Sequence, residues 1–375
     1  MKRLVCGLFV IIVILFLSPA KICQAADAES LLDEYDYKNI DAQIESNADY
    51  HISFKELVQD MMNSNDGKIS FQKYLNKISN MLKANKKAVM EIFLIGILSA
   101  ILRTFTSGVG NKQVSDTAQM ILSVTLVTIL AAVFAGAVKT ATDVLEGMIR
   151  FYQSICPVFF PAVMVAGGSV AAGAYYQIVV MMIGVVNMVF KNILIQVNNI
   201  YLLLGIADSV TEEEHYSKAC ELAQGAIKYI SKTVLVIFLG LNGLKGMVAP
   251  FLDSEKKSIL TRTLSLIPGV GNTAITVSKT MLGAGTIVKN SIGAAAMLVI
   301  VIISALPLMK LVVLAVLYKT LAAVLEPIAG KGIVNGVNIC SRAVGNLIQI
   351  LIVTIALLIM TIGIICMTTN VGYMV

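Results

Sequence analysis

Few residues in this chain could do chemistry, and the most informative are charged side chains inside long apolar segments. Lys245 lies within one apolar run, and Lys310 follows Pro307 within another. Glu91 and Glu326 are candidate partners for these lysines. A charge at membrane depth is costly and usually faces a bundle interior or water. Both lysines therefore either line a hydrated pathway, form structural pairs or extend toward lipid headgroups.

Glycine and proline residues form a second group of candidates. Pro157 and Pro161 fall in the apolar stretch Ile155–Ala174, which also holds Gly167 and Gly168. Backbone breaks of this kind are tolerated at membrane depth only where protein or a water-filled cavity covers them. We therefore expect a re-entrant or interfacial segment here, packed against the bundle. The same reasoning adds three packing or pathway candidates, which are Pro268, Gly283 and Gly285.

The sequence carries no recognisable catalytic or metal-binding motif. The P-loop pattern G-x-x-x-x-G-K-[ST] and the patterns G-x-S-x-G and H-E-x-x-H are absent. His51 and His215 are the only histidines, which excludes a His-rich metal site. The six cysteines include no CxxC pair and are typical of small packing residues. We therefore expect no catalytic residue, no cofactor, no bound metal and no enzymatic activity.

Composition places these residues in a multi-span membrane protein. Apolar residues make up 57% of the 375-residue chain and charged residues 14%, and the mean hydropathy is +0.82. Soluble domains are about 45–50% apolar and about 25% charged, so this chain has more apolar surface than a soluble core could bury. The net charge of +6 lies largely beside apolar segments. Lipid headgroups are therefore favoured over nucleic acid as counterions.

The apolar runs predict an all-α polytopic fold with about six to eight transmembrane helices and with re-entrant or amphipathic Gly-rich segments. The number stays open because Ile155–Ala174 and Ile193–Ala207 are doubtful, whereas Ala88–Leu102 is expected to span. The orientation of the later loops also stays open. With an exported N-terminus and six spans, basic later loops would lie outside the cytoplasm, which conflicts with the positive-inside tendency. The clear spans are Ala118–Val138, Tyr175–Phe190, Thr233–Leu252, Ile292–Leu317 and Leu347–Met367.

The N-terminus predicts a signal peptide over residues 1–25, with Lys2-Arg3, an apolar run and small residues before a cleavage site. An uncleaved anchor is the alternative. Residues 26–87 are polar and carry helical apolar stripes, one of which begins after a capping box of Ser53 and Glu56. Because so short a segment buries little apolar surface by itself, we expect it to dock on another protein surface. Residues 88–375 form the membrane domain, with a weak internal repeat between 150–252 and 262–367.

A pattern of proline, glycine and charge runs through the C-terminal half. It comprises Ile267-Pro-Gly-Val-Gly271, Leu282-Gly-Ala-Gly285, Val288-Lys-Asn-Ser-Ile-Gly293, Leu306-Pro-Leu-Met-Lys310 and Tyr318-Lys-Thr-Leu-Ala-Ala-Val-Leu-Glu-Pro327. With these residues the chain resembles the stage III sporulation protein AE family of endospore-forming bacteria. The resemblance implies a membrane subunit of the mother cell–forespore channel or secretion-like complex that endospore development requires. It also implies a place in the mother-cell membrane that surrounds the forespore.

The same resemblance implies partners. These are the stage III sporulation AA ATPase, the ring proteins of the intermembrane space and, across that space, stage II protein Q. Membrane lipid and further copies of the chain are expected contacts, and nucleic acid is not. The alternative function is a stand-alone secondary transporter or permease, which duplicated spans and intramembrane lysines would suit. A passive scaffold would tolerate neutral residues at Lys245 and Lys310.

We predict that the mature chain begins near Ala26 and that residues 26–87 lie outside the cytoplasm, because the first 25 residues have the layout of a secretory signal. N-terminal sequencing of the mature protein checks the first point. A reporter joined after Lys83 checks the second, and activity of that reporter only in the cytoplasm would contradict export.

Overall fold

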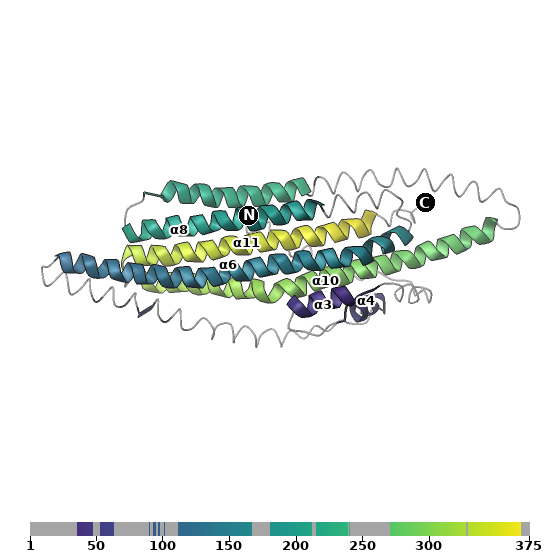
Figure 1. Ribbon diagram of the computed structural model, residues 1–375, viewed down its shortest axis with the longest axis horizontal. Helices are drawn as coiled ribbons and strands as arrows, with labels where there is room; N and C mark the ends of the chain where they lie inside the picture. The colour runs from purple at the N-terminus through teal and green to yellow at the C-terminus, as the bar shows by residue number, and fades with distance from the viewer. Residues whose placement is uncertain are drawn as a thin grey trace.

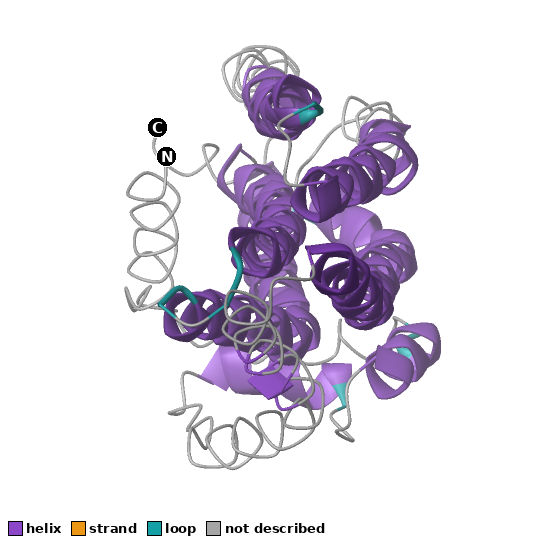
Figure 2. Cartoon of the chain, turned by 90° about the vertical axis from the view of Figure 1, so that its left-hand side faces the viewer, coloured by secondary structure: helices purple, strands orange, loops and turns teal. Residues whose placement is uncertain are grey.

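The computed structural model describes residues 36–47, 53–63, 112–166, 181–211, 215–238, 271–327 and 329–368, with Gly240 and a few positions between 90 and 101. All regular structure in these ranges is helical. The helices form an elongated bundle in which the longest members run side by side (Figure 1). The view along the bundle shows them packed around one another (Figure 2). The predicted all-α class is therefore confirmed for the described residues.

Two helices set the length of the bundle. They are α6 (Lys112–Val165), with 54 residues, and α10 (Gly271–Leu325), with 55 residues. At 1.5 Å per residue each is about 80 Å long, whereas a hydrocarbon core is about 30 Å thick. Each helix is therefore much longer than one crossing needs.

Pro157 and Pro161 lie inside α6, which continues through both of them to Val165. The break that the sequence suggested at these two residues is therefore absent. Each proline removes one backbone hydrogen bond. The two residues are four positions apart on one helical face, and both side chains are exposed. Because both rings face outward they displace no packed neighbour, and α6 continues past them to Val165. Gly167 and Gly168 lie outside the described residues.

The helix α11 (Lys331–Thr368) lies at the centre of the bundle and contacts α6, α8 (Ile195–Thr211) and α10. Its most apolar window is 67% buried, against 22% for that of α6. From Ala343 to Cys366 it carries no charged side chain, and each residue there is buried or half-buried. The other helices therefore pack around α11, with helix 217–238 and the π-helix η1 (Val189–Leu194) on the α8 side.

Four helical stretches in the described ranges are long and apolar enough to cross a membrane. They are Met120–Val165, Met181–Ser209, Gly283–Leu325 and Lys331–Cys366. The chain is thus a helical membrane protein. Most of Ala88–Leu102 and most of Thr233–Leu252 fall outside the described residues, so six to eight spans stays a prediction.

Two short helices, α3 (Lys38–Asn47) and α4 (Phe54–Asn63), pack against the side of α6 and α10. As the capping box predicted, α4 begins directly after Ser53. The Phe54 side chain is fully buried, with its ring 5.9 Å from Tyr37 and 6.4 Å from Phe151 of α6. The Phe54 backbone N–H donates to Asp41 Oδ1 at 2.6 Å, which joins the two helices. The described part of the polar segment, residues 36–47 and 53–63, therefore docks on the bundle of its own chain.

We predict that Phe54→Ala loosens this docking, because truncating a buried phenylalanine costs about 3–5 kcal/mol. Limited proteolysis of the protein in detergent should then cut residues 36–63 faster than in the unchanged protein. Asn39→Ala is the matched control, because Asn39 is an exposed residue of α3. Equal cleavage rates for the two variants would contradict the role of Phe54.

Candidate functional site

A pair of buried asparagines joins α8 to α11. The Asn346 side chain donates from Nδ2 to Asn198 Oδ1 at 2.9 Å. Asn198 in turn donates from Nδ2 to the backbone carbonyl of Ala343 at 3.0 Å. Asn198 is fully buried and Asn346 is 4% exposed. Because neighbouring side chains are apolar, sliding α8 along α11 would strand these amides, and the pair fixes the register of the two helices.

A buried lysine holds the C-terminal end of α11. Lys289 of α10 is fully buried, and its Nζ donates to the backbone carbonyl of Cys366 at 3.2 Å. That carbonyl is among the last four of α11, which have no partner within the helix and carry the negative end of its dipole. A lysine is therefore a favourable partner at this point. Lys289 serves as a capping residue contributed by a neighbouring helix.

Charged side chains also connect α6 to η1. Glu146 Oε2 accepts from Arg150 Nη1 at 3.2 Å, and Glu146 Oε1 accepts from Lys191 Nζ. All three side chains are partly exposed, at 32% for Glu146, 50% for Arg150 and 42% for Lys191. Lys191 lies in the π-helical turn, and such turns often occur at functional sites.

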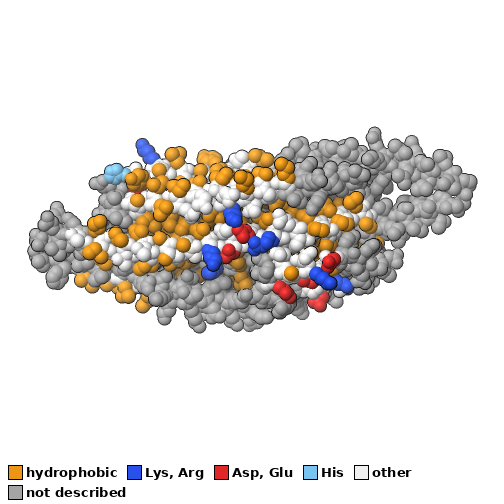
Figure 3. All heavy atoms as spheres, viewed as in Figure 1, with side chains coloured by type: hydrophobic (Ala, Val, Ile, Leu, Met, Phe, Trp, Pro, Cys, Tyr) orange, Lys and Arg blue, Asp and Glu red, His pale blue; other side chains and the backbone are white. Residues whose placement is uncertain are grey.

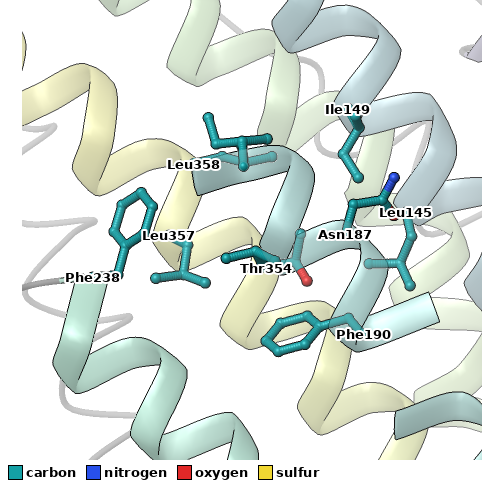
Figure 4. Close-up of a pocket in the computed structure, with 10 residues that line it drawn as sticks. Leu145, Ile149, Asn187, Phe190, Phe238, Thr354, Leu357 and Leu358 are labelled. Carbon is teal, nitrogen blue, oxygen red and sulfur yellow. The ribbon is translucent and has the colours of Figure 1, made fainter. Parts of the chain in front are cut away.

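One small cavity lies between α6, helix 217–238, α11 and the residues that lead into η1. Figure 4 shows Asn187 and Thr354 among apolar neighbours that include Leu145, Phe190 and Phe238. Its volume is about 10 Å³, which is close to the least space that one water needs. The Oδ1 atom of Asn187 is buried and meets no hydrogen-bond partner among the described residues. The cavity suits a single water and is far too small for an organic substrate.

Glycines let the helices approach closely at three levels. A Cβ on Gly285 would lie 3.0 Å from Val165 Cγ1 and 3.1 Å from the Ala166 backbone nitrogen. A Cβ on Gly293 would overlap the Cys366 sulfur, and one on Gly205 would lie 2.7 Å from Ile339 Cγ2. These positions accept no larger side chain unless a neighbour moves.

The comparison with known proteins assigns the chain to a family. The sequence profile described as stage III sporulation protein AE matches residues 52–369, which run from the start of α4 to the end of α11. The chain belongs to the stage III sporulation protein AE family. The resemblance stated from the sequence is thereby confirmed.

One curated relative gives the scale of similarity within the AE family. Stage III sporulation protein AE of Bacillus subtilis (strain 168) is 24% identical to this chain over 262 residues. The match covers 70% of this chain and 66% of the relative, so it leaves about a third of the relative uncovered. No solved structure is significantly similar to the chain.

The site residues suggested by the sequence do not gather into one place. Lys310 is exposed on α10, and Glu326 is exposed just past the end of that helix, about 24 Å farther along at 1.5 Å per residue. Gly283 is half-buried, whereas Gly285 is fully packed as described above. Lys245 and Pro268 lie outside the described residues, as do Gly167, Gly168 and the other suggested partner, Glu91.

The polar contacts in the bundle of this AE-family chain were missed by sequence reasoning. Asn198 and Asn346 are separated by 148 positions, so no local pattern pairs them. Lys289 stands in the quoted family pattern Val288-Lys-Asn-Ser-Ile-Gly293, but nothing in that pattern indicated a buried contact with the end of another helix. A polar residue at an otherwise apolar helical position was the one available signal for all three. In the described ranges, no cluster of three His, Cys, Asp or Glu side chains could hold a metal.

We predict that Asn346→Ala destabilises the bundle by about 1 kcal/mol, since hydrogen bonds between membrane helices contribute about 0.6–2 kcal/mol. Thermal or SDS-induced unfolding in detergent measures the change. Asn335→Ala, an exposed position on the same helix, is the matched control and should unfold like the unchanged protein. If both variants were equally stable, the asparagine pair would not fix the α8–α11 register.

Proposed function

We propose that this chain is the membrane subunit of the mother cell–forespore channel or secretion-like complex required for endospore development. Family membership over residues 52–369 is the observation that supports the role. The four apolar helices long enough to cross a membrane agree with it. The specific site would be the mother-cell membrane that surrounds the forespore, where a multi-pass subunit of such a complex must lie.

The proposed role is assembly and not catalysis. The interior contacts of the bundle hold helices in fixed positions through Asn198, Asn346, Lys289 and the packed glycines. None of these groups is arranged as a nucleophile with a base. Energy for transport would therefore come from a partner. The stage III sporulation AA ATPase is the partner that we propose for this task.

The remaining partners follow from the same role. Ring proteins of the intermembrane space and stage II protein Q would meet the exported face, and six to eight spans would complete the membrane domain. Residues 26–87 would be exported, and their helices α3 and α4 would lie beside the bundle as they do here. This arrangement gives the ring proteins a surface built from both the exported segment and the bundle.

We predict that deletion of the gene arrests sporulation after engulfment and leaves vegetative growth unchanged, since the proposed complex acts only then. Microscopy of engulfed forespores and spore counts after heat treatment measure the effect. Complementation with the unchanged gene is the control for polar effects. Expression in growing cells, with a solute-uptake defect and normal spore counts, would favour a stand-alone transporter instead.

A further inference from the structure

The outer surface of α6 differs from that of the other helices in the bundle. Between residues 125 and 153 its exposed residues are all small, polar or charged, and none has a bulky apolar side chain. We call this set the open face of α6; its members are Thr125, Thr128, Ala132, Ala135, Gly136, Lys139, Asp143, Arg150 and Gln153. Most members follow one another at three or four positions, so they form one stripe along the helix.

The other helices expose the bulky apolar side chains that suit contact with lipid tails. Examples are Leu203 on α8, Leu222 on helix 217–238 and Val316 on α10. The open face nevertheless lies within Met120–Val165, which is long and apolar enough to cross a membrane. Small residues on such a helix are typical of contact with another helix, and charges there face protein or water. The open face therefore has the composition of a helix-packing surface.

The bundle of one chain makes no use of the close approach that Gly136 allows. A Cβ on Gly136 would meet no atom within 4 Å, whereas one on Gly285 or Gly293 would press against a neighbouring helix. Glycine inside a helix costs about 1 kcal/mol relative to alanine, and packing within the chain does not offset this cost at Gly136. The two threonine hydroxyls of the open face donate to carbonyls of their own helix, so they need no outside partner.

The middle of the open face carries two unpaired charges of opposite sign. Lys139 and Asp143 are both exposed, and neither has an ion-pair or hydrogen-bond partner among the described residues. Their order, lysine before acid, is the less favourable one for an ion pair within a helix. The nearby Glu146 already pairs with Arg150 and Lys191. Figure 3 shows basic and acidic side chains gathered midway along the bundle and uncovered on that face. A partner for the open face must therefore offer both an acidic and a basic group.

A second copy of this chain offers both groups at once. Two copies that enter a membrane in the same orientation are related by a two-fold axis along the membrane normal, which sets equal residues at equal heights. Asp143 stands four positions from Lys139, or about 6 Å along the helix, a distance that a lysine side chain reaches. Each Lys139 can therefore meet Asp143 of the other copy, and the contact forms twice. An anionic lipid would pair with Lys139 but repel Asp143.

We propose that the open face of α6 is the interface through which two copies of this chain associate in the membrane. Ala132 and Gly136 have the four-residue spacing of small residues that lets two membrane helices cross at close range. The pairs of Lys139 with Asp143 then form one to two turns beyond the crossing. This inference does not rest on the proposed function, because it concerns only how two copies of the chain meet.

Charge reversal in the full-length protein tests the two ion pairs. Copies with a donor or an acceptor label on an added C-terminal tag are reconstituted in phosphatidylcholine vesicles, and energy transfer is measured as lipid dilutes the protein. Lys139→Asp alone and Asp143→Lys alone should each weaken self-association about tenfold, because like charges then meet across the two-fold axis. A mixture of the two variants should regain the association, since an acidic face then meets a basic one.

The mixture distinguishes contact between copies from contact within one helix. Neither variant can form an ion pair between positions 139 and 143 of its own chain, so recovery requires two copies to meet. Lys228→Asp, at an exposed position on helix 217–238, is the matched control and should associate like the unchanged protein. Energy transfer no higher than random mixing gives in the unchanged protein, or a mixture as weak as its two components, would overturn the proposal.

A larger residue at Gly136 tests the close approach. The space beside Gly136 is open within the chain, so the bundle should tolerate Gly136→Leu, whereas two helices crossing there should not. Gly225→Leu on helix 217–238 is the matched control, because a Cβ at that position also meets no atom within 4 Å. Self-association should weaken about tenfold for the first variant only. Equal association of the two variants would overturn the assignment of the interface to α6. Circular dichroism and thermal unfolding of every variant establish that the fold is retained.

Discussion

Burial of α11 is the constraint on which the rest of the bundle depends. From Ala343 to Cys366 this helix carries no charged and no exposed side chain, and α6, α8 and α10 supply the surface that surrounds it. Close approach requires small residues on the neighbours, which explains why Gly205 faces Ile339 and Gly293 faces Cys366. The α10–α11 contact is further joined by the Ser341 hydroxyl, which donates to the Ala315 carbonyl at 2.9 Å. The lengths and positions of the outer helices follow from the need to cover this one.

Uniform apolar packing specifies proximity but not alignment, because a helix that slides by a turn still buries apolar surface. The polar contacts fix the alignment of the helices, which apolar packing leaves open. Asn198 and Asn346 fix α8 along α11, and Lys289 fixes α10 against the end of α11. Each of these groups is nearly or fully buried, so a shifted arrangement would leave it without a partner. A few polar side chains therefore decide which of many apolar packings is adopted.

Composition and periodicity were sufficient for the helical class, for the membrane character and for the start of α4, since these depend on local sequence. Hydropathy located the apolar part of α6 but not its full length, because the apolar run ends near charged residues such as Asp143 through which the helix continues. Pro157 and Pro161 were overestimated as helix breakers, because α6 continues through both residues to Val165. The pairing of Asn198 with Asn346 could not be predicted, because it is formed only when residues far apart in sequence meet.

The unbroken length of α6 and α10 affects how the bundle responds to force. A hydrogen-bonded helix of about 80 Å resists compression and bending along its axis, so it behaves as a stiff rod over the whole molecule. Two such rods clamped around α11 would move together when either end is pushed. A load applied at the turn after Leu325 would be felt near Lys289 without any rearrangement in between. A displacement at one end of these two helices would therefore reach the other end.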